Sequence, residues 1–97
     1  MEINKEIEDF IKSFDFMRLG QAISNERWQS AAMIIQRMDR TAKSCGINNF
    51  EKQFTALRIS INRKNVTDCK SILSGIINKR VQILKEIMNE NDSERED

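Results

Sequence analysis

Residues 28–47 have the sequence WQSAAMIIQRMDRTAKSCGI, and the fold prediction starts from this segment. Its apolar residues recur at intervals of three and four, which places them on one side of an α-helix. These positions are Trp28, Ala31, Ile34, Ile35, Met38, Ala42 and Cys45. Gly46 follows, and glycine enters the left-handed conformation of a helix end without steric cost. The stretch therefore predicts one amphipathic helix that ends at Gly46.

The sequence after Gly46 predicts two further helices. Asn48 with Glu51, and Asn65 with Asp68, have the spacing of a capping box, in which side chains accept the free backbone N–H groups at a helix start. The first helix carries an apolar stripe of Phe50, Phe54, Leu57 and Ile61. The second, longer helix is predicted to bury Val66, Cys69, Leu73, Ile76, Ile77, Val81, Leu84 and Ile87.

The sequence before Trp28 predicts a short N-terminal helix and a second helix. Apolar residues at three- and four-residue intervals mark the first: Ile3, Ile7, Phe10, Ile11 and Phe14. Asn4 is a candidate cap for this helix, and Asp15 is a candidate cap for the next one. The second helix is predicted to turn Phe16, Leu19, Ala22 and Ile23 inward. The pattern leaves open whether residues 1–24 form one kinked helix or two.

Together these segments predict an all-α fold, an antiparallel up-down four-helix bundle with a short additional N-terminal helix. The absence of proline from the sequence favours long helices joined by short turns. Residues 1–88 are predicted to form a single bundle domain, and residues 89–97, which contain no apolar residue, a disordered acidic tail. A weak repeat with a period of 38 residues fits either a true internal repeat or two helical hairpins of matched length.

Charge is segregated along the chain, although the net charge is only +1. Residues 1–17 carry two lysines and five acids, residues 18–86 carry thirteen basic side chains and five acids, and residues 87–97 carry one arginine and five acids. A basic body therefore lies between two acidic ends. This distribution favours anionic partners for the body, unless the acidic ends fold over the body and neutralise it. Both interpretations stay open.

The composition argues against catalysis. The chain has no histidine, the commonest general base at neutral pH, and its three glycines are too isolated to form a phosphate-binding loop. Cys45 and Cys69 cannot supply the four ligands of a common zinc site, and both fall on apolar helix faces where cysteine serves as a small core residue. We expect no enzymatic activity, no metal and no cofactor.

The same composition predicts a cytoplasmic protein. No apolar run approaches the roughly 20 residues of a membrane span. The first residues carry charges where a signal peptide needs an apolar segment. We therefore expect no membrane association, and we expect both thiols to be reduced.

Residues 36–46, QRMDRTAKSCG, resemble the motif of histidine-containing phosphotransfer (Hpt) domains of bacterial and plant signalling relays, which is close to H-x-L-K-G-S-A-x-x-L-G. Trp28 lies eight residues before the histidine position and Gly46 ten residues after it, as in the family. The later apolar stripe and its polar turn at Asn65 also fit, so that the resemblance covers about residues 16–87. It implies a four-helix bundle whose motif helix is approached by receiver domains.

The chain departs from the family where the chemistry resides. Gln36 occupies the position of the phosphorylated histidine, and an amide cannot accept a phosphoryl group. Arg40 replaces a small residue that gives the receiver domain access, and Lys43 lies on the same stripe one turn further on. With Arg37, these residues predict a basic face, so that the candidate partner-binding residues are Gln36, Arg37, Arg40 and Lys43. The plain alternative is that the basic side chains only solvate the helix.

The resemblance predicts a non-catalytic protein–protein interaction module of signalling or regulation, a degenerate Hpt-like domain that docks a response-regulator receiver domain without phosphotransfer. The alternative is a structural or regulatory helical protein that forms homo-oligomers or binds nucleic acid through its basic body. Met33, Ile59 and Met88 lie off the main apolar stripes and are candidates for a self-association surface. Scarce aromatic residues and scattered basic ones argue against nucleic acid as the partner.

Overall fold

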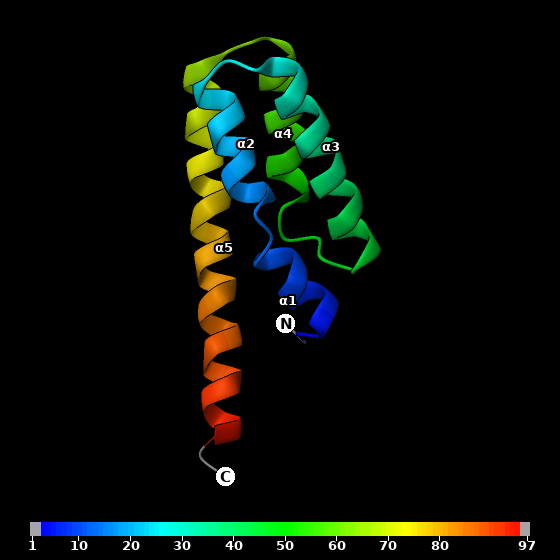
Figure 1. Ribbon diagram of the computed structural model, residues 1–97, viewed down its shortest axis with the longest axis vertical. Helices are drawn as coiled ribbons and strands as arrows, with labels where there is room; N and C mark the ends of the chain where they lie inside the picture. The colour runs from blue at the N-terminus through cyan, green and yellow to red at the C-terminus, as the bar shows by residue number, and fades with distance from the viewer. Residues whose placement is uncertain (1–2, 96–97) are drawn as a thin grey trace.

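The computed structural model describes residues 3–95, with the surroundings of side chains up to residue 89, and these residues form five α-helices and no strand. The helices are α1 (Lys5–Ile11), α2 (Asp15–Ser24), α3 (Trp28–Ser44), α4 (Glu51–Asn62) and α5 (Val66–Arg95). The predicted all-α class is confirmed. α5 is the longest helix and extends beyond α2, α3 and α4 at one end of the molecule (Figure 1).

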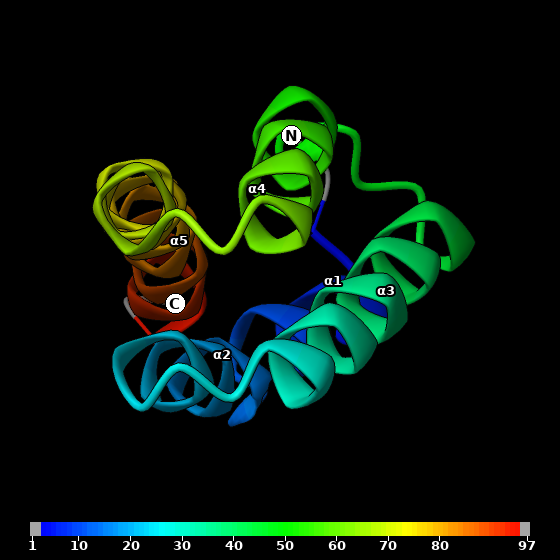
Figure 2. The same cartoon turned by 90° about the horizontal axis from the view of Figure 1, so that it is seen from above.

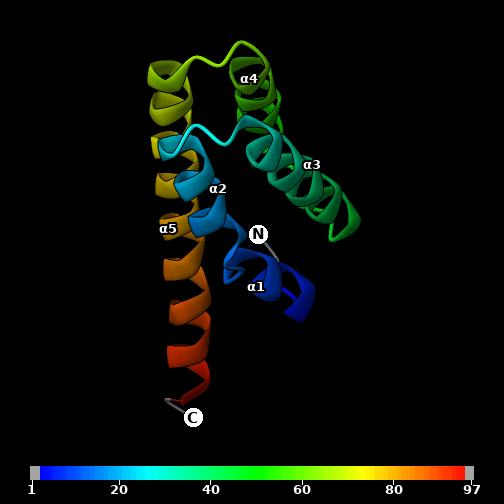
Figure 3. The same ribbon diagram turned by 45° about the horizontal axis from the view of Figure 1, so that its top comes forward.

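Each of α2 and α4 packs against both α3 and α5. Viewed along the long axis, these four helices surround a common centre (Figure 2). The short α1 packs against α3 and α5 and lies beyond the start of α2 (Figure 3). The largest fully buried side chains are Phe16, Phe50, Phe54, Ile11, Leu19, Ile23, Ile35, Met38, Leu57 and Ile76. Four helices and α1 thus share one core.

Four phenylalanines connect α1 to the rest of this core. The Phe10 ring of α1 lies edge-on to Phe16 of α2, with 5.5 Å between the ring centroids. Phe50, just before α4, lies 6.0 Å from Phe16 and stacks on Phe54 at 5.3 Å. Such pairs contribute about 0.5–1.5 kcal/mol each beyond the burial of their area. α1 is therefore an integral part of the core and not an appendage.

Three helices end in the same way. The residue after the cap has a positive φ in each case: 54° at Glu26, 81° at Gly46 and 55° at Lys64. The next backbone N–H then donates to the carbonyl five residues earlier, at 2.8, 2.9 and 3.1 Å respectively, which is the pattern of a Schellman motif. The predicted stop at Gly46 is confirmed. Glu26 and Lys64 are 38 residues apart, which is the period of the weak repeat.

Two of the predicted helix starts are confirmed in detail. The Asn4 Oδ1 atom accepts a hydrogen bond from the Ile7 N–H at 2.9 Å and caps α1. Asn65 Oδ1 accepts from the Asp68 N–H at 3.0 Å, and the Asn65 Nδ2 atom donates to Asp68 Oδ2 at 2.9 Å. This second pair forms a polar clasp at the start of α5.

The other two predicted caps are wrong. α4 begins at Glu51 with Phe50 in the cap position and no side-chain cap, because the chain here buries Phe50 completely and directs the backbone by packing. Asp15 does begin α2, but its carboxylate caps no backbone N–H and is bound by Arg37. Residues 12–14 interrupt the helical backbone, so the described part of segment 1–24 contains two helices.

α5 differs from its prediction in two places. Its backbone is helical through Arg95, although residues 89–97 are predicted to be disordered, and residues 96 and 97 lie outside the described residues. Extending an existing helix is far less costly than starting one, and glutamate and arginine favour helices. Val81, predicted to be core, is 41% exposed, whereas Ile83 is 4% exposed.

Candidate functional site

The predicted binding residues all lie on α3. Three of them, Gln36, Arg40 and Lys43, are exposed and share one side of the helix, since residues separated by four and seven positions lie above one another. The opposite side of α3 buries Ile35, Met38 and Ala42, among others. Gln36, which the resemblance places at the phosphoacceptor position, is therefore in contact with solvent near the middle of α3.

The structure separates Arg37 from the other three residues. Its guanidinium turns toward α2, where Nη2 donates to Asp15 Oδ1 at 2.7 Å and Nε to Asp15 Oδ2 at 3.0 Å. These hydrogen bonds and the charge of Asp15 raise the pKa of Arg37 above its ordinary value. Arg18 Nη1 lies 3.6 Å from the same carboxylate. Arg37 thus connects α3 to the first turn of α2.

Lys43 lies in a charge cluster that spans α3 and α4. Its Nζ atom is 3.0 Å from Asp39 Oδ2, and Nη1 of Arg58, on α4, approaches the same oxygen at 3.6 Å. The Asp39 side chain is only 14% exposed, while Lys43 and Arg58 are mostly solvated. Sequence reasoning missed Arg58. Its contact with Asp39 of α3 depends on how the two helices pack, and no short-range sequence pattern indicates it.

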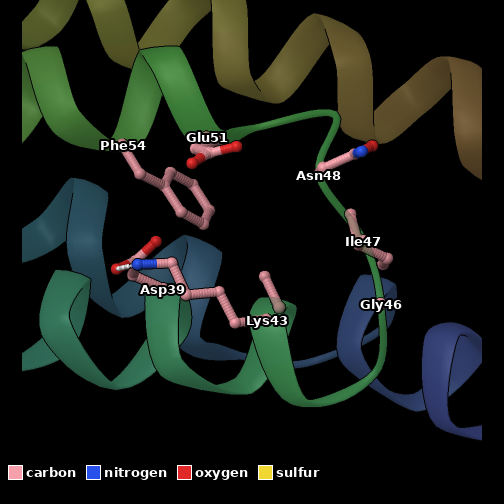
Figure 4. Close-up of a pocket in the computed structure, with 8 residues that line it drawn as sticks. Asp39, Lys43, Gly46, Ile47, Asn48, Glu51 and Phe54 are labelled. Carbon is pink, nitrogen blue, oxygen red and sulfur yellow. Dashed lines mark hydrogen bonds and ion pairs between the residues drawn. The ribbon is translucent and has the colours of Figure 1, made fainter.

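Two hollows lie along the groove between α3 and α4, on either side of this cluster. The first is lined by Ala32, Ile35, Gln36, Arg58, Ile61 and Asn62. The second lies between the end of α3 and the start of α4, where Asp39 and Lys43 face Glu51 and Phe54 (Figure 4). Gln36 and Lys43 therefore each line a depression of the surface.

Arg40 differs from Lys43 and Arg58 in its ion pairing. It is exposed, and it forms no ion pair with any side chain that the structure describes. A guanidinium in this state is suited to a bidentate contact with a carboxylate of a partner. We call Gln36, Arg40, Lys43 and Arg58 the α3 face. Its amide and cations can bind anionic groups, but they include no nucleophile or general base.

The two cysteines lie apart from the α3 face. Cys69 is fully buried in α5, and burial, with a smaller effect of neighbouring Asp68, raises the pKa of its thiol. Cys45 is half-buried, and its Sγ atom lies 3.6 Å from the carbonyl oxygen of Ala42. Within the described residues, no three histidine, cysteine, aspartate or glutamate side chains are grouped to hold a metal ion. No helix there has the length and apolarity to cross a membrane.

Comparison of the chain with protein-family models, with curated proteins and with solved structures gives no match. The α3 face is therefore characterised by its own geometry. It consists of Arg40, which forms no ion pair with a described side chain, of two cations that share the Asp39 carboxylate, and of the exposed Gln36 amide, which lines one of the two hollows.

Proposed function

We propose that the chain is a non-catalytic protein–protein interaction module, a degenerate Hpt-like domain that docks a receiver domain through the α3 face without phosphotransfer. The exposure of Gln36 at mid-helix, with Arg40 and Lys43 on the same side, is the observation that carries this proposal. A buried Gln36 would have made the position inaccessible to any partner. The absence of histidine from the sequence means that docking is proposed without turnover.

The proposed architecture is an antiparallel up-down four-helix bundle of α2, α3, α4 and α5, with α1 as the additional helix. Its support is the packing of α2 and α4 against both α3 and α5, together with the short connections between successive helices. In such a bundle the α3 face lies on the outer side of two neighbouring helices, from Gln36 at the middle of α3 to Lys43 near its end, with Arg58 on α4. A partner can approach it from the side of the bundle.

The proposed contact is electrostatic and hydrogen-bonded. A receiver domain presents an acidic pocket, which Arg40 can enter with a bidentate guanidinium contact. Lys43 and Arg58 share the Asp39 carboxylate and are mostly solvated, so that each retains capacity for a second acidic group. The Gln36 amide can donate a hydrogen bond where a histidine would take the phosphoryl group. Such a complex holds a receiver domain and leaves its phosphorylation state unchanged.

The test is a titration of isotope-labelled protein with receiver domains, followed by NMR. We expect chemical-shift changes centred on the α3 face, and we expect Arg40→Glu to weaken binding at least tenfold. Arg63→Glu, a charge reversal at the exposed turn after α4, is the matched control and should leave the affinity nearly unchanged. Shift changes confined to another surface, or equal effects of the two variants, would contradict the proposal.

A second experiment tests the Hpt alignment separately. The double variant Gln36→His with Arg40→Gly restores the histidine and the small residue of the family motif. The double variant is mixed with a phosphorylated receiver domain that binds it. We expect the phosphoryl group to move from the receiver aspartate to the new imidazole nitrogen, which leaves the aspartate as a free carboxylate. A double variant that still docks but forms no phosphohistidine would reject the alignment, and because it lacks Arg40 we expect it to dock more weakly than the natural chain. Strong, salt-sensitive binding of the natural chain to nucleic acid would instead favour the alternative function.

A further inference from the structure

α5 carries apolar side chains on two of its sides. One set packs into the core, and each of its members is at most 4% exposed: Cys69, Ile76, Ile83 and Ile87. The second set has a four-three-four spacing and consists of Ile77, Val81, Leu84 and Met88. This spacing is that of a helix that packs along another helix. Yet Val81 is 41% and Met88 62% exposed, while Ile77 and Leu84 are half-buried.

Exposed apolar side chains also occur at the start of α2, close to this part of α5. A Cβ atom at Gly20 would lie 3.5 Å from the Leu73 side chain, so this edge of α2 faces α5. Met17 lies about one turn before Gly20 and is 56% exposed, and Phe14 lies another turn back and is 69% exposed. Arg80 binds the Ile11 carbonyl at 2.7 Å, which places the junction of α1 and α2 beside residue 80. We call Phe14, Met17, Ile77, Val81, Leu84 and Met88 the α5 seam.

The geometry of α5 also separates the acidic C-terminal segment from the basic body. Residues 87–97 carry five acids and one arginine, against thirteen basic side chains and five acids in residues 18–86. α5 is a continuous helix through Arg95, and its last turns project beyond the other helices (Figure 3). A continuous helix cannot fold back on itself. The part of this segment up to Arg95 therefore cannot neutralise the basic body of its own chain. It can reach the body of a second chain.

We propose that two copies of the chain pair through the α5 seam, with their α5 helices antiparallel. An interface between identical copies that closes on itself is the commonest form of association. Antiparallel pairing places the acidic segment of each copy beside the basic body of the other, whereas parallel pairing would bring the two acidic segments together. Lys70 and Lys85 are exposed and lie eleven residues before and four residues after Val81, on the same side of α5.

The second copy covers apolar surface that the described part of the chain leaves in contact with water. The α5 seam lies on α2 and α5, and the α3 face lies on α3 and α4, so that pairing and receiver docking use separate surfaces. The dimer therefore does not depend on the proposed function. A dimer of this kind would present two α3 faces.

Sedimentation of the full chain tests the proposal. The protein concentration is varied from about 10 to 200 µM, a range in which a dimer with a small interface dissociates. Each measurement is made at about 50 and 500 mM salt. We expect a dimer at high concentration and low salt that dissociates on dilution. Val81→Glu and Met88→Glu should each weaken the dimer at least tenfold. Met33→Glu, on α3, is the matched control, since Met33 is 63% exposed outside the seam. Because all three positions are exposed, we expect the helical circular dichroism signal to be unchanged.

Salt dependence tests the orientation. Antiparallel pairing brings opposite charges together, so raising the salt concentration should weaken the dimer. Association that strengthens with salt would contradict the antiparallel arrangement. A chain that stays monomeric throughout, or a Met33→Glu variant as disruptive as Val81→Glu, would overturn the α5 seam as the interface.

Discussion

Arg37 of α3 and Asp15 of α2 are joined by two hydrogen bonds, of 2.7 Å from Nη2 and 3.0 Å from Nε. This fork ties the middle of one helix to the first turn of another, where a negative charge is favoured by the helix dipole. Arg37 therefore has a structural partner within the chain. Its inclusion among the binding residues followed from its place beside Gln36 in the sequence, but its side chain faces a different neighbour.

A double-mutant cycle measures this pair. We expect Arg37→Ala and Asp15→Ala to lower the free energy of unfolding by less together than the sum of their separate effects, because both remove the same interaction. The coupling should be small and should shrink at high salt, since Arg37 is largely solvated. Arg18→Ala, which removes the longer 3.6 Å contact to Asp15, should couple less strongly. Urea denaturation at two salt concentrations provides the measurement, and a coupling that grows with salt would contradict the ion pair.

Glu26 and Lys64 hold a left-handed backbone conformation at φ 54° and 55°. This conformation is strained for residues with a Cβ atom and free of strain for glycine. Each residue is exposed, so that its side chain contributes little packing. We therefore expect Glu26→Gly and Lys64→Gly each to raise the free energy of unfolding by about 0.5–1 kcal/mol. The effect is read from the midpoint of urea denaturation.

The control for these variants is Arg63→Gly. Arg63 precedes Lys64 but has φ −84°, an ordinary helical conformation. Glycine at this position removes no strain and increases the freedom of the unfolded chain, so the variant should be neutral or less stable. If Lys64→Gly and Arg63→Gly lost stability equally, the strain at Lys64 would be refuted.

The all-α class and the extents of most helices followed from the sequence because apolar spacing is a local property. Asn4, Gly46 and Asn65 act as the sequence predicts, since a cap or a stop involves residues only a few positions apart. Asn48 carries a similar signal and fails, because the burial of Phe50 controls the start of α4.

The charges at the candidate site were less predictable. The spacing of Gln36, Arg40 and Lys43 places them on one side of a helix, as the structure shows. The partners of Arg37 and Lys43 depend on which helices lie beside α3, and this is decided by the packing of the whole chain. Arg58 is 19 residues from Asp39 in the sequence and meets it only when α4 packs against α3. The prediction that Val81 is buried is wrong, because periodicity alone does not show which of the two apolar stripes of α5 is covered.

The Cys69 thiol makes stability depend on pH in the alkaline range. Burial raises its pKa in the folded state, so the folded protein holds this proton more tightly than the unfolded chain. The stability associated with the neutral thiol is complete below about pH 8.5, the ordinary value for cysteine, and falls as the pH rises toward the folded-state pKa. We expect Cys69→Ala to flatten this decline in urea denaturation between about pH 7 and 10. Cys45→Ala serves as the control and should keep the decline; an unchanged slope in Cys69→Ala would exclude this thiol as its source.

Arg80 secures α1 to the core, and its removal should loosen that helix first. Its Nε atom donates to the carbonyl of Ile11, the last residue of α1, at 2.7 Å, and its guanidinium lies 4.9 Å from the centroid of the Phe16 ring. A carbonyl at a helix end has no partner within its helix, so the loss of this donor leaves it unsatisfied. We expect Arg80→Ala to lower the free energy of unfolding by about 1–3 kcal/mol.

Hydrogen exchange distinguishes local loosening of α1 from general loss of stability. We compare exchange rates in Arg80→Ala with those in the natural protein. The rate should increase more for the amides of α1 than for those of α3 and α4, because Arg80 holds the end of α1. Arg80→Lys retains the charge but not the planar guanidinium, so the exchange rate in α1 should lie between those of Arg80→Ala and the natural protein. Lys85→Ala, an exposed position on the same helix, should leave exchange in α1 unchanged. Uniformly faster exchange in all helices of Arg80→Ala would show that Arg80 stabilises the core as a whole and does not specifically anchor α1.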